Sequence, residues 1–337
     1  MSSGADWPCA ALRRASLADR TTMRVGGRIE WLLEPDHPDR LVAAWRMALD
    51  RGCAPRVLGG GANVIAADGD HAGVVIATAR MARIFRPHRE TAGVEALGAP
   101  GAGAPFDPAL PRVDHFAGDP DPRLVAWAGV PLPGLVRAAR NLGWSGLEGL
   151  VGVPGQVGGG VAMNAGGRWG ELWDVIEAVR LLLPDGTVVH RTRAESAPRY
   201  RDGNLEGAVV LGAVVRLVPG DPAEIRERMK ELLRAKSAAQ PVTEHSSGCI
   251  FKNPDPELAS GRSAGRLVEE CGGKGRRRGD AVVSPKHANF IVNRGQATAA
   301  DVLGLVDDVQ RLVADRTGIL LEREVVVWVA SPPAARE

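Results

Sequence analysis

Two glycine-rich segments, Gly59-Gly60-Gly61 and 152–166, constrain the fold of this chain more than any other feature of its 337 residues. Glycine contributes 42 residues, and eleven of them fall between Gly143 and Gly170. The usual glycine content of a globular protein is only about 7%. Because glycine has no side chain to hold a ligand away, such a concentration indicates backbone that approaches a ligand closely.

The first segment follows a predicted strand at 56–58 and continues into Ala62 and Asn63. Successive glycines can turn several backbone N–H groups into one concavity, which suits a phosphate group. The simpler alternative is a tight turn between packed strands. The spacing is not G-x-G-x-x-G and no helix pattern follows, which disfavours a nicotinamide-binding fold of the usual kind.

The second segment, 152–166, is made of small and apolar residues apart from Gln156 and the polar residue Asn164. Two such loops in separate predicted units could hold one large anionic cofactor from both sides, because a diphosphate needs several N–H donors and little side chain between them. The alternative, two unrelated turns, leaves Asn164 unexplained.

Composition excludes several classes of protein. Lys and Arg total 42 against 40 Asp and Glu, a net charge of +2, which provides no field for nucleic acid or an anionic membrane. Aromatic residues are only 4%, too few to suggest a surface that stacks nucleobases. No apolar run approaches the ~20 residues of a membrane span, and Arg13, Arg14 and Asp19 lie where a signal peptide would be apolar. Four dispersed cysteines predict neither a disulfide scaffold nor a metal site, so we expect a cytoplasmic protein.

The order of patterns predicts several α/β units. A strand at 29–33, a helix that Pro38 begins and Gly52 ends, and strands at 56–58 and 74–76 come first. A Gly, Pro, Ala and Asp-rich stretch from Pro87 to Pro122 reads as an insertion or linker, and further strands and a helix follow up to 218. Pro219-Gly220-Asp221-Pro222 is the best domain boundary, and an amphipathic helix is expected after it, from Ala223 to Lys236. Thr298 with Asp301 predicts a capping box at the start of the last helix.

Six motifs in order resemble the UDP-N-acetylenolpyruvoylglucosamine reductase family, over roughly residues 20 to 330. They are Thr22-Met23-Arg24-Val25-Gly26-Gly27, the loop 59–63, the segment 152–166, Tyr200-Arg201, Gly248-Cys249-Ile250-Phe251-Lys252-Asn253-Pro254 and Leu321-Glu322-Arg323-Glu324-Val325. One glycine loop recurs by chance, but six ordered motifs do not.

The resemblance implies an α+β protein whose FAD-binding fold is of the vanillyl-alcohol-oxidase (PCMH) type. Two α+β subdomains, 1–82 and 83–218, would hold FAD without a covalent link, and an α+β substrate-binding domain would span 219–321. A C-terminal strand at 322–330 would return to the first subdomain.

The implied reaction belongs to peptidoglycan precursor synthesis, and so to cell-wall formation, cell shape and division. NADPH would reduce the flavin and leave, and UDP-N-acetylglucosamine enolpyruvate would then take the same site. Hydride from flavin N5 would reach the vinyl carbon, and protonation of the adjacent carbon would give UDP-N-acetylmuramate. No metal, nucleic acid or membrane is implied, and we expect a monomer.

The resemblance also assigns binding residues by position. Those expected to bind the cofactor are Thr22, Gly59, Gly60, Gly61, Ala62, Asn63, Val153, Gly155, Gly158, Gly159, Asn164, Ala165 and Gly166. Those expected to bind substrate are Tyr200, Lys252, Asn253 and His287. Because Tyr200 is the sole tyrosine, the chain resembles the subclass that lacks a substrate-loop tyrosine.

Three residues would perform the chemistry. Hydride addition builds negative charge on the substrate carboxylate, which requires a fixed cation and an acid. By position these are Arg201, the glutamate Glu324 (preferred over Glu322, which would share its strand face), and Cys249 as proton donor to carbon. Most relatives carry serine in place of Cys249. A thiol, with a reference pKa of about 8.5, is the better acid provided that it stays protonated.

Departures from the family pattern and two rival functions remain open. Gly203 stands where the family usually has serine, and Gly167-Arg168-Trp169 replaces Ala-Tyr-Gly. An oxidase of the same fold would typically carry an attachment His or Cys beside the first glycine loop, whereas His71 lies beyond it. The non-enzymatic alternative is a nucleotide-binding module with degenerate chemistry, for which Cys249 is the only hint.

Overall fold

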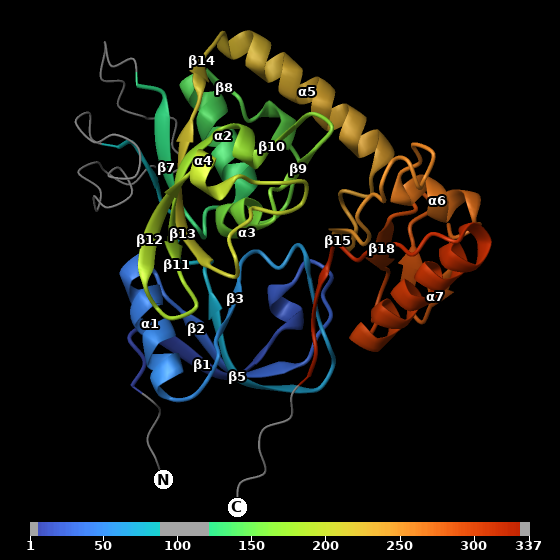
Figure 1. Ribbon diagram of the computed structural model, residues 1–337, viewed down its shortest axis with the longest axis horizontal. Coiled ribbons are helices and arrows are strands. Elements are labelled where there is room, and N and C mark those ends of the chain that lie inside the picture. The colour runs from blue at the N-terminus through green and yellow to red at the C-terminus, as the bar shows by residue number, and fades with distance from the viewer. Residues whose placement is uncertain (1–5, 88–120, 331–337) are drawn as a thin grey trace, which may run out of the picture. The chain divides into compact units, whose positions relative to one another are not determined.

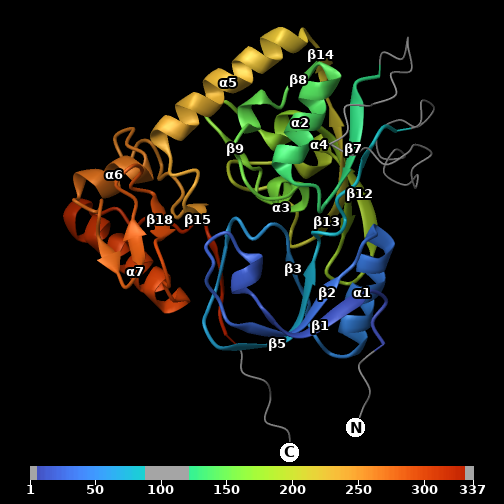
Figure 2. The same ribbon diagram turned by 180° about the vertical axis from the view of Figure 1, so that it is seen from behind.

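The computed structural model of the chain describes residues 6–87 and 121–330 (Figures 1 and 2). By their internal contacts these residues form two compact units. Among the described residues, unit 1 draws on 6–11, 33–60, 75–87 and 121–234, and unit 2 on 12–32, 61–74 and 235–330. The insertion expected from Pro87 to Pro122 lies almost wholly outside the described residues, and the division into three domains stays a prediction.

The N-terminal α/β pattern forms a four-stranded sheet and one helix. The strands lie in the order β1-β2-β5-β3, with β3 parallel to β5. Their bounds are Ala10–Ser16 for β1, Arg28–Glu34 for β2, Arg56–Leu58 for β3 and Asp70–Ala77 for β5. Helix α1, Pro38–Asp50, begins where His37 Nδ1 accepts a hydrogen bond from the amide of Asp39 at 3.1 Å. Gly52 follows this helix with a φ of +72°, so the proline and glycine signals predicted both of its ends.

A five-stranded antiparallel sheet forms the larger part of unit 1, in the order β12-β11-β13-β7-β6. Its strands are β6 (Ile84–Phe85), β7 (Arg123–Trp127), β11 (Ile176–Leu182), β12 (Val188–Thr192) and β13 (Val209–Arg216). Helices α2 (Leu132–Leu142) and α3 (Val157–Ala162) share one hydrophobic core with this sheet. The core includes Leu135 of α2, Val161 of α3 and Val179 of β11, and its burial is the main force that holds unit 1 together.

Another four-stranded sheet, in the order β15-β18-β17-β16, lies in unit 2. Its strands are β15 (His245–Cys249), β16 (Arg277–Arg278), β17 (Ala281–Val283) and β18 (Phe290–Asn293). Helices α6 (Ala264–Glu270) and α7 (Ala299–Thr317) pack beside it, as both ribbon views show (Figures 1 and 2). The predicted capping box is present, because the amide of Asp301 donates to Thr298 Oγ1 and the amide of Thr298 donates to Asp301 Oδ2, both at 3.0 Å.

The C-terminal strand is shorter than the range 322–330 that the family resemblance implies. It covers Val326–Trp328 (β19) and pairs in parallel with β4, Val64–Ala66. The preceding residues bond elsewhere, because the carbonyl of Glu322 accepts a hydrogen bond from the amide of Lys252 at 2.9 Å. Glu322 and Glu324 therefore flank Arg323, which forms an antiparallel bridge with Phe251, and both residues precede β19.

Helix α5, Pro222–Ala239, matches the amphipathic helix predicted after the boundary at 219–222. The remaining elements are η1 (Ala18–Arg20), β8 (Trp144–Ser145), η3 (Glu148–Leu150), β9 (Gly166–Gly167), β10 (Gly170–Glu171), η4 (Leu172–Asp174), α4 (Arg193–Ser196) and β14 (Val218–Pro219).

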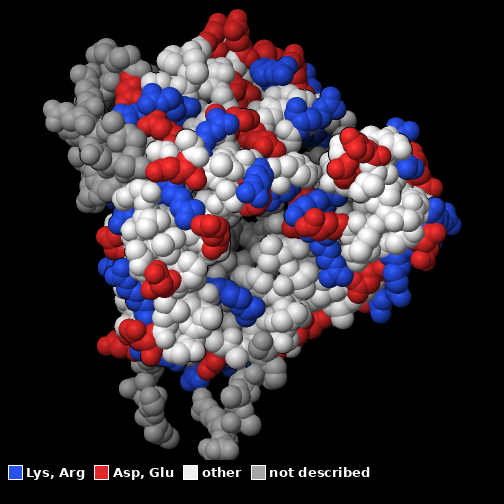
Figure 3. Space-filling model, in the orientation of Figure 1, with Lys and Arg blue, Asp and Glu red and all other residues white. Residues whose placement is uncertain are grey.

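Acidic and basic side chains are intermixed on the face drawn in Figure 3, in keeping with the nearly balanced charge of the sequence. No helix in the described part of the chain has the length and apolar character needed to span a membrane.

Candidate active site

The two glycine-rich segments meet within unit 1. A Cβ atom added to Gly60 would lie 3.0 Å from the Cα of Gly155, and one added to Gly59 would lie 3.5 Å from Oε1 of Gln156. The hydroxyl of Thr78 donates to the same Oε1 at 2.7 Å and fixes that side chain. Two loops far apart in the sequence thus lie against each other, as a ligand that lies along both loops requires.

The glycines of these segments are needed for different reasons. Gly61 has a φ of +62°, and a Cβ there would overlap the carbonyl of Arg20, so the protein itself demands glycine. Gly158 packs against Ala128, whose Cβ would lie 2.9 Å from a Cβ at 158. Gly159 differs, because nothing lies within 4 Å of a Cβ added there, although alanine is the better helix former. A glycine that neither packing nor backbone conformation requires suits close approach by a diphosphate, so the residues present fit FAD.

Thr22 and Asn63 connect the first glycine loop to the segments of unit 2 that carry predicted catalytic residues. The hydroxyl of Thr22 donates to the carbonyl of Ser246 at 2.6 Å, and its amide donates to the carbonyl of Gly61 at 3.1 Å. The side-chain amide of Asn63 donates to the carbonyl of Glu324 at 3.1 Å. Both side chains therefore have a role in the architecture of the site, and their contact with the cofactor stays a prediction.

Cys249 and Glu324 come from neighbouring backbone segments of unit 2. Cys249 ends β15 directly after Gly248, which has a φ of +76°, and it is half-buried and forms no disulfide. The amide of Glu324 donates to the carbonyl of Ile250 at 2.8 Å, so Glu324 lies beside the residue that follows Cys249. The structure thus brings these two predicted residues into one part of unit 2.

Arg201 lies in unit 1, in a turn where its own φ is +56°. Its Nη2 donates to the carbonyl of Gly166 at 2.9 Å, and its Nη1 lies 3.7 Å from Oε1 of Glu171. The ring centroid of Tyr200 lies 4.9 Å from its Cζ. Only 13% of the Arg201 side chain is exposed, so this cation is enclosed by protein and is not a solvated surface charge.

Asn164 organises the surroundings of Arg201. It is buried, and its Nδ2 donates to Oε2 of Glu171 at 2.7 Å and to the carbonyl of Arg199 at 3.0 Å. Its Oδ1 accepts a hydrogen bond from the amide of Trp173 at 3.3 Å. The polar residue that stood out in a run of small residues is thus explained by contacts within the protein. Sequence reasoning missed Glu171, and the only signal for it was an acid directly after the glycine-rich run.

The departure at Gly203 has a packing reason. Its amide donates to the carbonyl of Ala162 at 2.8 Å, and a Cβ at this position would overlap the carbonyl of Val161. The backbone here lies against α3 so closely that the serine usual in the family does not fit this arrangement.

The predicted substrate-binding residues have defined partners. Lys252 Nζ lies 2.6 Å from Oε1 of Glu322, whose side chain is 72% exposed. The Oδ1 of Asn253 accepts a hydrogen bond from the amide of Ala264 at 3.0 Å, at the start of α6. Tyr200 is exposed in unit 1, whereas Lys252 and Asn253 lie in unit 2.

His287 borders a cavity of about 520 Å³ within unit 2. The cavity is lined by Ser263, Gly265, Arg266, Glu269, Glu270, Lys286, His287 and Ala288. Burial lowers the pKa of His287, and the nearby Lys274 acts in the same direction. Its Nδ1 accepts a hydrogen bond from the amide of Asn289 at 3.2 Å, which fits a neutral ring. His287 is therefore suited to hydrogen bonding in this cavity.

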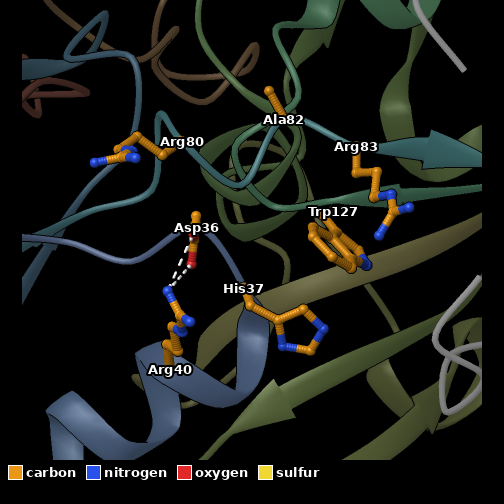
Figure 4. Close-up of a pocket in the computed structure, with 7 residues that line it drawn as sticks. All are labelled: Asp36, His37, Arg40, Arg80, Ala82, Arg83 and Trp127. Atoms are coloured by element: carbon orange, nitrogen blue, oxygen red, sulfur yellow. Dashed lines mark hydrogen bonds and ion pairs between the residues drawn. The ribbon is translucent and has the colours of Figure 1, made fainter. Parts of the chain in front are cut away.

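A further cavity of about 410 Å³ in unit 1 involves none of the predicted site residues (Figure 4). Asp36 and Arg40 form an ion pair at its edge, and the rings of His37 and Trp127 meet edge to face at 4.9 Å. His71, the nearest histidine after the first glycine loop, is buried with its Nε2 2.8 Å from the carbonyl of Ala67. No cluster of His, Cys, Asp or Glu able to hold a metal ion occurs among the described residues.

Two family models match the chain. One is described as the C-terminal domain of UDP-N-acetylenolpyruvoylglucosamine reductase and matches residues 240–328, and the other is an FAD binding domain and matches residues 111–192. The second match confirms the prediction that the cofactor is FAD.

Proteins named UDP-N-acetylenolpyruvoylglucosamine reductase align with almost the whole chain. The one from Deinococcus radiodurans is 38% identical over 323 residues, which are 95% of this chain and 96% of that protein. The one from Anaeromyxobacter dehalogenans is 40% identical over 315 residues, 93% and 84% of the two chains. A crystal structure of the reductase from Thermus caldophilus has a TM-score of 0.71, 36% identity and coverage of 95% of this chain and 98% of that one. This match confirms the predicted fold class.

Proposed function

Because the chain belongs to the UDP-N-acetylenolpyruvoylglucosamine reductase family, we propose that it reduces UDP-N-acetylglucosamine enolpyruvate to UDP-N-acetylmuramate for peptidoglycan precursor synthesis. Membership makes the chain an oxidoreductase with FAD and NADPH as cofactors. The observation that carries the proposal is the contact between Gly60 and Gly155, which places two glycine-rich loops together beside the open position at Gly159.

The residues that would hold FAD are the glycines of both loops. Gly59, Gly60, Gly155 and Gly159 would offer backbone N–H groups to the diphosphate with no side chain in between. When bound, FAD supplies the hydride for the substrate. We expect a non-covalent complex, since His71 is buried and already lies against a backbone carbonyl.

Arg201 would stabilise the charge that grows on the substrate carboxylate. Its guanidinium is largely enclosed, which strengthens its electrostatic effect relative to a solvated cation. Because Gly166 and Glu171 contact the guanidinium of Arg201, this group would already be oriented when the substrate binds.

Cys249 would give its thiol proton to the carbon that bears the ether oxygen. The backbone hydrogen bond between Glu324 and Ile250 supports a role for Glu324 beside it. Tyr200, Lys252, Asn253 and His287 would bind the UDP-sugar, with Lys252 exchanging its partner Glu322 for the diphosphate. We further propose a cytoplasmic monomer that contributes to cell shape and division through cell-wall synthesis.

A steady-state assay tests this function. The purified protein with NADPH and UDP-N-acetylglucosamine enolpyruvate should form UDP-N-acetylmuramate, identified by its mass. A parallel assay with NADH in place of NADPH measures the nucleotide preference. The same protein with alditols or aromatic alcohols and oxygen should form no peroxide. Peroxide formation without the lactyl product would mean that the chain is an oxidase, and would contradict the proposed function.

A further inference from the structure

Arg201 is a long, flexible side chain on a backbone turn that is itself unusual. Its φ of +56° is one of several positive values in this turn, together with Asn204 and Glu206 at +54°. Residues in such conformations persist only where the surroundings hold them. The guanidinium therefore needs fixed partners if it is to meet a substrate carboxylate in one orientation.

Two polar partners of this guanidinium come from one short hairpin, β9–β10. Gly166, whose carbonyl accepts from Nη2, is the strand partner of Glu171, whose carboxylate lies 3.7 Å from Nη1. A side chain at Gly166 would crowd Glu171, since an added Cβ would lie 2.5 Å from the Cα of Glu171. The close pairing of these two residues thus presents a carbonyl and a carboxylate to the same guanidinium.

Glu171 is itself fixed at both ends. Its Oε2 accepts from the buried Asn164 at 2.7 Å, and its amide donates to Oδ2 of Asp174 at 2.8 Å. Only 31% of its side chain is exposed. A carboxylate restrained in this way restrains the guanidinium, and a guanidinium has five donors, so it can be held by the protein and still bind a second carboxylate.

We infer that Glu171 is a positioning residue for Arg201, which sets the orientation of the guanidinium for the substrate carboxylate without touching the substrate. This inference rests on the proposed role of Arg201 in substrate reduction. It assigns to the β9–β10 hairpin, and to Asn164 behind it, a role in the hydride-accepting half of the reaction.

The test is Glu171→Gln, which keeps the shape of the side chain and an acceptor for Asn164 but removes the charge. In stopped-flow experiments on the FAD-loaded protein, reoxidation of the reduced flavin by the enolpyruvyl substrate should slow by about 10- to 100-fold. Reduction of the flavin by NADPH and the visible flavin spectrum should not change. Glu171→Asp, which keeps the charge, should recover part of the lost rate.

Asp174→Asn is the matched control, because it removes the charge of a neighbouring carboxylate in the same turn, while the asparagine Oδ1 can still accept the hydrogen bond from the amide of Glu171. It should leave the rate of reoxidation unchanged. Equal slowing by Asp174→Asn, or equal loss of both half-reactions in Glu171→Gln, would mean that Glu171 only supports the fold, and would overturn the inference.

A double-mutant cycle separates this inference from the proposed function. Glu171→Gln should slow reoxidation strongly in the native protein and only slightly in the Arg201→Lys background, because its effect passes through the guanidinium. Equal slowing in both backgrounds contradicts the inference alone. If Arg201→Lys itself leaves reoxidation unchanged, the proposed role of Arg201 fails, and the inference fails with it.

Discussion

Gly60 and Gly155, which belong to different glycine-rich loops, lie so close that a Cβ on Gly60 would be 3.0 Å from the Cα of Gly155. Backbone at this separation leaves N–H groups, and no side chains, to meet a ligand that lies along both loops. The contact converts two separate sequence patterns into one candidate binding site for the FAD diphosphate.

Gly159→Ala should weaken FAD binding while the protein stays folded. The added methyl group meets no protein atom within 4 Å, and alanine favours the helix by about 0.5–1 kcal/mol over glycine, so any loss comes from the ligand side. Fluorescence titration of the apoprotein with FAD measures the affinity. Gly134→Ala, in helix α2 with only ordinary contacts at 3.8 Å, is the control and should bind FAD normally. Native affinity in Gly159→Ala would contradict the placement of the diphosphate.

Cys249→Ala should separate the two half-reactions. Flavin reduction by NADPH needs no proton from the thiol and should proceed normally, whereas reduction of the enolpyruvyl substrate should fall by at least about 10²-fold. Stopped-flow absorbance measures both steps. Cys249→Ser, which restores a hydroxyl donor, should recover turnover. Equal loss of both steps in Cys249→Ala would instead indicate a structural role for this residue.

Glu324→Gln and Glu322→Gln should differ strongly. The amide of Glu324 donates to the carbonyl of Ile250, the residue after Cys249, and replacing the Glu324 carboxylate by an amide should slow substrate reduction by about 10²-fold or more. Glu322 is 72% exposed and paired with Lys252, so its amidation should change turnover little, since exposed ion pairs contribute only about 0–1 kcal/mol. If Glu322→Gln proves the more damaging variant, the assignment of the catalytic acid is reversed.

His287 should make the protein less stable at mildly acidic pH. Burial, assisted by Lys274, lowers its pKa in the folded state, so the unfolded chain binds the proton more readily. The contribution of neutral, buried His287 to the stability of the folded protein is present above the unfolded pKa of about 6.5. It is lost as pH falls below that value toward the pKa in the folded state. We therefore expect the free energy of unfolding in urea to fall less between about pH 7.5 and about pH 5.5 in His287→Gln than in the native protein. His190, whose pKa is also lowered by burial and by Arg180, is present in both proteins, so its effect on stability cancels in the comparison. An equal or greater loss in His287→Gln would contradict the burial argument.

Local signals in the sequence were sufficient for the elements that frame the site. Pro38 and Gly52 mark the ends of α1, and Thr298 with Asp301 marks the start of α7, because caps and turn residues act within a few positions along the chain. The two glycine-rich loops are identifiable for the same reason, and their composition also predicts that they hold one cofactor together.

Contacts between distant segments could not be predicted in this way. The pairing of Glu171 with Arg201 depends on a two-stranded hairpin and on Asn164, and neither the charge nor the spacing of these residues indicates it. The strand at the C-terminus was predicted too long, because residues 322–324 bond to residues 250–252 before the chain reaches β4. The need for glycine at 203 likewise became visible only once the carbonyl of Val161 was in place.

An anaerobic two-step titration of the purified protein tests whether this chain uses bound flavin to pass hydride from NADPH to an enolpyruvyl sugar. We expect a yellow protein whose visible flavin band is bleached by NADPH and restored stoichiometrically by UDP-N-acetylglucosamine enolpyruvate. A protein that takes up no FAD, or a reduced flavin that the enolpyruvyl sugar does not reoxidise while oxygen does, would contradict it.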